Sequence, residues 1–141
     1  MRISTKGRYA LRLMLDLAMN GGEGFIPLKA VAQRQEISDK YLEQIIHRLS
    51  REGFVTSARG AQGGYRLARR PEDYSVGEIL RTVEGSLAPV SCLDCDTPCD
   101  KFDSCLTIGL YKKIQDAVDG VVDNTSLADI INEYRAKHAE A

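Results

Sequence analysis

Residues 37–67 read ISDKYLEQIIHRLSREGFVTSARGAQGGYRL, a pattern that predicts one helix followed by one β-hairpin. Four aliphatic residues recur at the i, i+3, i+4, i+7 spacing of an apolar helix face, namely Leu42, Ile45, Ile46 and Leu49. Ser38 is a suitable N-cap for this helix, which is expected to reach Arg51. Residues 54–57 and 65–67 are predicted strands, because the glycine-rich residues between them are typical of a turn.

Two further helices are predicted before this stretch. A stripe of apolar residues indicates a helix over about 4–20, which ends at Gly21 and Gly22. Pro27 is placed to open a short helix over about 28–33, since proline is tolerated in a first turn. Three helices followed by a glycine-tipped hairpin predict a winged helix-turn-helix, in which the helix over 38–51 reads DNA.

The pattern changes after Pro71. Ser75 and Glu78 form a capping box for a helix to about residue 83, whereas residues 85–104 lack periodicity and are expected to be a loop. A narrow apolar seam then predicts a long helix that packs on a second copy of itself; packing on the chain's own fourth helix is the alternative. The seam consists of Leu106, Leu110, Ile114, Ala117 and Val121. A last helix is expected after a capping signal at 126–129.

The predicted fold class is therefore mainly α with a small β-hairpin wing: a winged helix-turn-helix plus a long C-terminal dimerisation helix. We expect a DNA-binding domain over 1–74. The region over 75–141 is expected to contain the cysteine-bearing loop, at 85–105, and the dimerisation helices. A chain of 141 residues is long enough to bury a core of this size.

Composition narrows the class of protein. No apolar run of about 18 residues could span a membrane, and the first residues lack the apolar middle of a signal peptide, so the cytoplasm is the expected location. Residues 1–70 carry 13 Lys and Arg against 6 Asp and Glu, whereas residues 71–141 carry 6 against 14. The basic first half suits a polyanion such as DNA, although a solvated basic face is the alternative.

The polar face of the predicted helix over 38–51 supplies candidate DNA contacts. The residues expected to reach base edges are Ser38, Lys40, Glu43 and Gln44. Because a glutamate accepts from cytosine but is repelled by phosphate, Glu43 is expected to set specificity rather than affinity; pairing with His47, or a place on a solvated face, is the alternative. Tyr41 and Arg51 are placed for backbone phosphates. Arg59, at the hairpin tip, suits the negative potential of a narrow minor groove.

All four cysteines lie in one short segment, at Cys92, Cys95, Cys99 and Cys105. In a cytosolic protein this clustering favours metal binding over disulfides. Thiolates bind both zinc and iron–sulfur clusters, but a structural zinc site usually consists of two separated pairs of ligands. Four cysteines crowded into one loop therefore favour a cluster over zinc. A redox disulfide switch and four inert structural cysteines are further alternatives.

Several motifs resemble those of the IscR-type regulators, the iron–sulfur members of the Rrf family of winged-helix repressors. They are the opening MRISTKGRYA, YLEQ at 41–44, Arg59-Gly60 with Gly63-Gly64-Tyr65, and CLT at 105–107. The similarity runs from Met1 to about Glu133. It implies a homodimer that binds a palindromic operator in double-stranded DNA, carries a [2Fe–2S] cluster and controls genes for cluster assembly, as a repressor or with a dual role.

The resemblance also assigns roles to residues. Cys92, Cys99 and Cys105 match the three cysteine ligands, although the first interval is one residue longer here. Glu43 matches a glutamate that discriminates between operator classes, and Arg59 matches the arginine of the wing.

The fourth ligand is where the chain departs from this family. IscR-type proteins often have a histidine three residues after the last cysteine, where this chain has Ile108. Other branches use an acidic residue near position 8 of the partner subunit, but Arg8 cannot bind a metal. Cys95 is the local candidate, and ligation by four cysteines would also permit a [4Fe–4S] cluster. Family members without a cluster sense cysteine status through a protein partner and lack these cysteines.

The sequence thus predicts a transcription regulator that senses cluster status, with cluster binding ordering residues 85–104 and biasing the winged helices through the fourth and dimerisation helices. An enzyme is not expected, because the sequence has no phosphate loop, nucleophile–base pair or acidic dyad. Two alternatives stay open. One is a redox- or zinc-stabilised winged-helix repressor of another sulfur or stress pathway; the other is a small iron–sulfur carrier protein, which would not explain Arg59.

Overall fold

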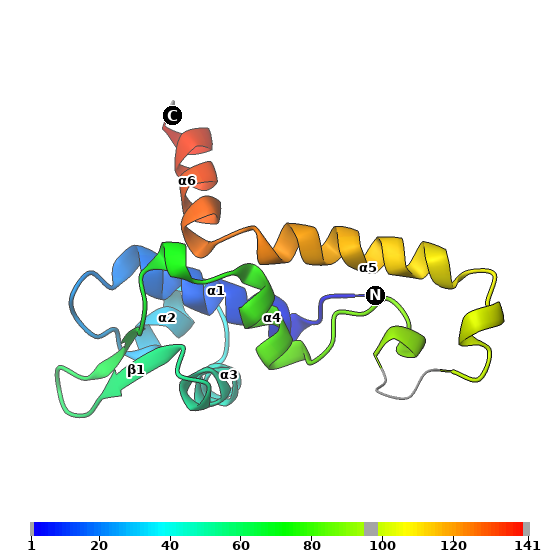
Figure 1. The fold of residues 1–141 in the computed structure, drawn as a ribbon. Helices are drawn as coiled ribbons and strands as arrows, with labels where there is room; N and C mark the ends of the chain where they lie inside the picture. The colour runs from blue at the N-terminus through cyan, green and yellow to red at the C-terminus, as the bar shows by residue number, and fades with distance from the viewer. Residues whose placement is uncertain (1, 95–98, 140–141) are drawn as a thin grey trace.

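A computed structural model describes residues 2–94 and 99–139 of the chain. These residues form six α-helices and one two-stranded antiparallel sheet (Figure 1). The helices are α1 (Thr5–Asn20), α2 (Leu28–Gln35), α3 (Asp39–Arg51), α4 (Val76–Glu84), α5 (Ile108–Asp123) and α6 (Leu127–His138). The strands are β1 (Val55–Ala58) and β2 (Gly64–Leu67). Three short 3-10 turns are η1 (Pro71–Asp73), η2 (Ser91–Leu93) and η3 (Phe102–Ser104).

The predicted winged helix-turn-helix with its wing and long C-terminal helix is confirmed, with small differences at the ends of elements. α2 continues two residues further than predicted and ends where Glu36 adopts a left-handed φ of 55°. Glycine is the usual residue in that conformation, so the sequence contained no clear stop signal. β1 lies one residue later than predicted, β2 begins one residue earlier and ends as predicted, and Val55 pairs with Leu67.

α4 is buried on two faces, and this places it at the centre of the molecule. Ile79 and Val83 join the main core, which is formed by the apolar faces of α1, α2 and α3. Val76 and Leu80 pack instead against Val122 of α5, in a second apolar cluster. α4 therefore joins the core of the winged helix to α5.

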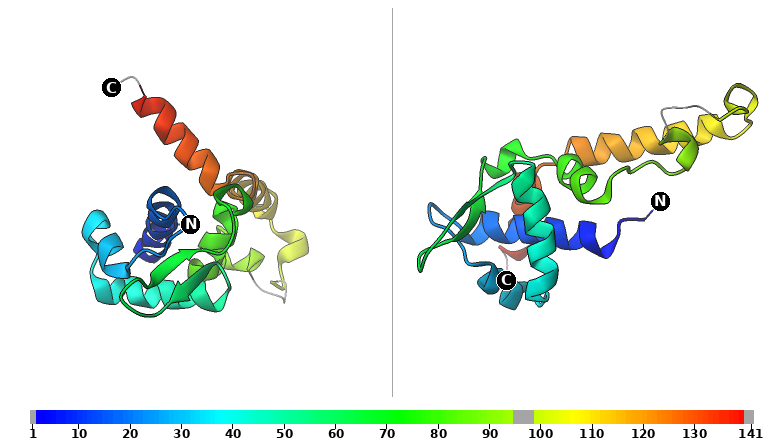
Figure 2. Two further views of the ribbon diagram at one scale, coloured as in Figure 1. Left: turned by 90° about the vertical axis from the view of Figure 1, so that its left-hand side faces the viewer. Right: turned by 90° about the horizontal axis from the view of Figure 1, so that it is seen from below.

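Figures 1 and 2 show α5 projecting away from the winged-helix body, with α6 turning off at its near end. We use the term cysteine segment for residues 85–107, which run from the end of α4 to the projecting end of α5. Backbone hydrogen bonds fasten the near end of α5 to the body: the Val76 amide donates to the Thr125 carbonyl at 2.9 Å, and Leu127 donates to Tyr74 at 3.2 Å. Leu127 is fully buried in the main core.

Tyr74 closes the base of the wing. Its buried hydroxyl donates to the Phe54 carbonyl at 2.5 Å and accepts from the amides of Ala68 and Arg69, each at 3.0 Å. Its ring meets the Phe54 ring edge-on, with centroids 6.0 Å apart. One side chain thus ties the start of β1 to the segment that leaves β2, which fixes the direction of the hairpin.

We expect Tyr74→Phe to lower the free energy of unfolding by about 1–3 kcal/mol, because the Arg69 amide loses its acceptor in a buried site. The Ala68 amide and the Phe54 carbonyl each lose one partner but keep their mutual bond of 3.2 Å. Urea denaturation followed by circular dichroism measures this change. Tyr134→Phe is the matched control, since Tyr134 is 53% exposed on α6, and its effect should stay within about 0.5 kcal/mol. Equal effects of the two substitutions would contradict the role given to the Tyr74 hydroxyl.

Candidate DNA-binding surface and cysteine segment

The outer face of α3 carries four of the predicted DNA-contacting residues side by side. Ser38, Lys40, Glu43 and Gln44 are all exposed, while the aliphatic residues on the opposite face are buried in the core. The Ser38 hydroxyl accepts from the Tyr41 amide at 3.2 Å and caps the helix, as predicted. That hydroxyl retains its own proton, so it can still donate to DNA.

Glu43 and Tyr41 differ in how free they are to contact DNA. Within the described residues Glu43 forms no ion pair, so the alternative of pairing with His47 is not what the structure has. Tyr41 is half-buried, and its ring packs edge-on against Tyr9 of α1 with centroids 5.5 Å apart. Tyr41 therefore joins the recognition helix to α1 whether or not it also reaches a phosphate.

Arg59 is exposed at the tip of the wing and forms no ion pair with the described residues. The wing is anchored behind it by Gly64, which has a φ of 147° and lies against the backbone of the loop before α2. A Cβ at Gly64 would come within 2.2 Å of the Ile26 carbonyl oxygen. Ile26 pairs with Tyr65 in an isolated antiparallel bridge. Arg51, the last residue of α3, is also exposed.

An ion pair between a buried carboxylate and a partly exposed arginine, which we did not predict, holds α2 against α1. Asp16 is 3% exposed, and its two carboxylate oxygens accept from the Arg34 guanidinium at 2.7 and 3.0 Å. The Gln35 amide donates a third bond, at 2.9 Å. A signal did exist in the sequence: Asp16 lies among the apolar residues of the first helix, and a charge on a buried face requires a partner. The pair ties the end of α2 to α1.

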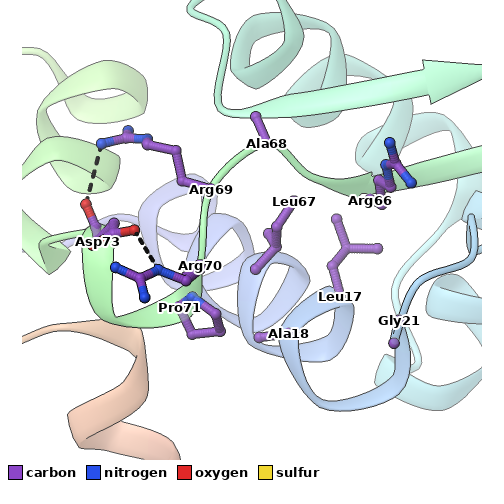
Figure 3. Close-up of a pocket in the computed structure, with 11 residues that line it drawn as sticks. Leu17, Ala18, Gly21, Arg66, Leu67, Ala68, Arg69, Arg70, Pro71 and Asp73 are labelled. Atoms are coloured by element: carbon purple, nitrogen blue, oxygen red, sulfur yellow. Dashed lines mark hydrogen bonds and ion pairs between the residues drawn. The ribbon is translucent and has the colours of Figure 1, made fainter.

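The hollow behind the wing is occupied by internal contacts of its own arginines. Figure 3 shows this cavity of about 580 Å³ between α1 and the end of β2. Arg70 pairs with Asp73, and Arg69 donates to the Asp73 carbonyl. Arg66 donates to the Glu23 carbonyl. Because each arginine already has a protein partner, we place no ligand site here.

Three of the four predicted metal ligands fall within the described residues. Cys92 lies in η2 and is partly exposed, Cys99 is exposed before η3, and Cys105 follows η3 and is partly exposed. Cys95 lies outside the described residues. Among the residues that are described, no three Cys, His, Asp or Glu side chains are gathered closely enough to hold a metal ion.

Side-chain contacts are present at the end of the cysteine segment, next to α5. The Cys105 sulfur lies 3.4 Å from the Thr107 hydroxyl, and hydrogen bonds from Thr107 lower the pKa of the Cys105 thiol. The Lys112 ammonium lies over the Phe102 ring at 4.6 Å, which joins η3 to the second turn of α5. A thiolate is the form of cysteine that binds metal.

The predicted seam of α5 faces away from the rest of the described chain. Leu106, Leu110 and Val121 are 100%, 57% and 65% exposed. The alternative, that this seam packs on α4, is not observed, because Val118 and Val122 occupy that contact. None of the helices in the described ranges is long and apolar enough to cross a bilayer.

Comparison with known proteins identifies the family. The model of the Rrf2 family, described as an iron-dependent transcriptional regulator, matches residues 3–133. The regulator CymR of Bacillus subtilis is 42% identical over 130 residues, covering 92% of this chain and 89% of CymR. IscR of Escherichia coli is 39% identical over 132 residues, covering 94% and 81%.

Solved structures give the same result. That of CymR, described as the global cysteine regulator of B. subtilis, superposes with a TM-score of 0.78 at 41% identity, covering 94% of this chain and 98% of that one. That of IscR from T. potens gives 0.77 at 39% identity, covering 95% and 88%.

The relatives are regulators rather than enzymes, which agrees with the prediction from sequence. CymR and IscR are almost equally similar to this chain, so the comparisons do not decide which signal it senses. Since the family model and the relatives both span more than nine-tenths of the chain, it belongs to the Rrf2 family of transcriptional regulators.

Proposed function

We propose that this regulator is a cytoplasmic homodimer that senses the supply of iron–sulfur clusters through its cysteine segment and represses cluster-assembly genes when clusters are plentiful. The observation that carries the proposal is the position of the cysteines. All four lie in the connection between α4 and α5, where a bound group could act on the winged helix. By resemblance to IscR-type proteins we expect a [2Fe–2S] cluster held by Cys92, Cys99 and Cys105, with Cys95 as a candidate fourth ligand.

The donors of the cysteine segment fit such a cluster chemically. Cys92, Cys99 and Cys105 offer soft thiolate ligands, which iron–sulfur clusters require, and all three have some exposure to solvent. Thr107 favours the thiolate form of Cys105. Because no three donors among the described residues are gathered, we infer that binding draws the segment together and orders it.

The proposed mechanism is an order–disorder switch. A bound cluster would supply strong iron–thiolate bonds that cross-link the segment. The chain's own residues do the rest: α4 and α5 hold the two ends of the segment, and α4 is buried against α1 of the winged helix. A segment ordered in one arrangement selects one position of α4, and so one placement of the recognition helices on DNA.

In this proposal the DNA contacts come from α3 and the wing. Lys40 and Gln44 reach base edges together with Ser38, and Tyr41 and Arg51 contact phosphates. Glu43, which is exposed and unpaired within the described chain, accepts from cytosine and excludes operators that lack this donor. Arg59 enters the minor groove of a palindromic operator from each wing.

For Arg59→Ala we expect about a tenfold loss of affinity for operator DNA and a smaller dependence of that affinity on salt, since one cationic contact to DNA disappears.

Glu43→Ala should instead leave affinity for the best operator nearly unaffected and strengthen binding to duplexes that lack the preferred cytosine. Fluorescence anisotropy, with duplexes selected from a randomised pool, measures both changes. Glu133→Ala removes a negative charge from α6 instead of α3 and serves as the control for Glu43→Ala. If Glu43→Ala weakened every duplex equally, Glu43 would have no role in specificity.

The cluster is tested by comparing wild-type protein, reconstituted without oxygen, with a variant in which Cys92, Cys99 and Cys105 are all alanine. We expect the wild type to contain iron and sulfide, to absorb visible light and to bind a cluster-dependent operator about tenfold more tightly than the variant. Wild-type protein stripped of iron is the control, and it should bind like the variant. Equal affinity of all three forms for every selected duplex would remove the sensing function.

Dimerisation is supported by the seam of α5. Leu106 and Leu110 lie at one end of the seam and Val121 at the other, with Ile114 near its centre. Two antiparallel copies of α5 that meet at Ile114 would therefore cover the exposed residues of both. A two-fold axis at this position would present one recognition helix to each half of a palindromic operator.

Leu110→Asp should convert the dimer to a monomer, because a carboxylate at the seam would lose its hydration in the interface. Sedimentation equilibrium at micromolar protein measures the change, and circular dichroism confirms that the variant is folded. Asn132→Asp places the same carboxylate on exposed α6 and should leave the dimer intact. A wild-type protein that sediments as a monomer, or a dimer unaffected by Leu110→Asp, would contradict this arrangement.

The similarity to CymR favours a second candidate, a regulator of sulfur metabolism. In that case the cysteine segment would respond to oxidation or hold zinc instead of a cluster. The sulfide content and visible absorption of the same anaerobic protein separate the two candidates, since colourless protein without sulfide supports the second.

A further inference from the structure

The carboxylate of Glu84, the last residue of α4, caps the first turn of α1. Its Oε1 atom accepts from the Ser4 amide at 2.9 Å, the Ser4 hydroxyl at 2.5 Å and the Gly7 amide at 3.0 Å. Ser4 is the nominal N-cap of α1, but its own hydroxyl is 3.4 Å from the Gly7 amide. The acceptor nearest to this helix terminus therefore comes from a residue 80 positions away in the chain.

Gly7 leaves room for this carboxylate. Gly7 is buried, and a Cβ added to it would come within 2.2 Å of Glu84 Oε1. In the first turns of an exposed helix alanine is more favourable than glycine. Glycine here is explained by the carboxylate that lies against it, and the first turn of α1 and the end of α4 are fitted to each other.

The same end of α4 carries the start of the cysteine segment. Gly85, with a φ of 84°, follows Glu84 directly. The next residues, 86–88, line a hollow of about 350 Å³ together with residues 2 and 3 and with α4 and α5. One turn before Glu84, Arg81 binds Asp119 of α5 at 2.7 Å and Asp123 at 2.5 Å. The last turn of α4 therefore contacts α5 and also carries the start of the cysteine segment.

α1 in turn is joined to the recognition helix. The Tyr9 ring, less than one turn after Gly7, meets the Tyr41 ring in the first turn of α3. Ala10 and Leu13 of α1 belong to the same buried cluster as Leu42 of α3. A displacement of the first turn of α1 would therefore reach the residues that we propose to contact DNA.

We infer that Glu84 is a positioning residue that transmits the state of the cysteine segment to the recognition helix by holding, or releasing, the first turn of α1. This inference rests on the proposed function, because it requires that a cluster changes the segment. Ordering of residues 85–107 would move the end of α4. The three hydrogen bonds to Glu84 Oε1 would pass that movement to Ser4 and Gly7.

The test measures coupling rather than binding alone. Operator affinity is determined for the anaerobically reconstituted and the iron-free forms of wild type, Glu84→Ala and Gly7→Ala, on one cluster-dependent duplex. We expect a ratio of about tenfold between the two forms of wild type, a typical size for coupling between sites, and a ratio below about threefold in both variants. Hydrogen exchange of the Gly7 amide should accelerate in iron-free Glu84→Ala, a readout that needs no cluster.

Glu78→Ala is the matched control, because Glu78 is a capping carboxylate at the opposite end of the same helix. It removes the capping box of α4 but does not touch α1, so its affinity ratio should equal that of wild type. A wild-type-like ratio in Glu84→Ala and Gly7→Ala would overturn the inference while the proposed function stands. A ratio of one in wild type itself would overturn both. A reduced ratio in Glu78→Ala as well would show general loosening of α4 and would also overturn the inference.

Discussion

The burial of α4 on two faces is the constraint on which the rest of the structure depends. Its sequence VGEILRTVE places Ile79 and Val83 on one stripe and Val76 and Leu80 on the next. The first stripe completes the core of the winged helix, and the second receives α5. A helix committed on both sides cannot shift relative to one neighbour without moving against the other, because packed interfaces have discrete arrangements. The connection to the cysteine segment is therefore stiff at this end.

The cysteine segment has the opposite character. Its described residues contribute no buried side chain, and its three described thiols are partly or fully exposed. Fixing the backbone of such a segment costs about 1–2 kcal/mol per residue in conformational entropy. Leu87 packs against the second apolar cluster, but no other described residue of the segment joins either cluster. In the proposed function a bound cluster would offset the remaining cost, so that a stiff helix would meet a segment ordered by its ligand.

Periodicity explains which parts of this description the sequence could supply. The helices, the wing, the exposed face of α3 and the seam of α5 follow from spacings of 3.6 and 2 residues, which are local properties. The contacts of Asp16, Tyr74 and Glu84 are not local. Asp16 binds residues 18 and 19 positions away, and Glu84 caps a helix 80 positions away. A single sequence shows the polar residue but does not show which distant residue it contacts. Glu36 was missed for a different reason, since it occupies a left-handed position without being glycine.

The similarity of the backbone to both CymR and IscR indicates where the signal must be read. If two regulators with different names share nearly the same fold with this chain, the fold alone does not set the signal, and in the proposed function side chains decide which signal is read. In this chain the side chains able to do so are concentrated between Cys92 and Cys105, outside both apolar clusters. Residues there can change without loss of the core. A common scaffold can thus acquire a new sensor by substitution in one exposed segment, provided that α4 continues to connect this segment to α1.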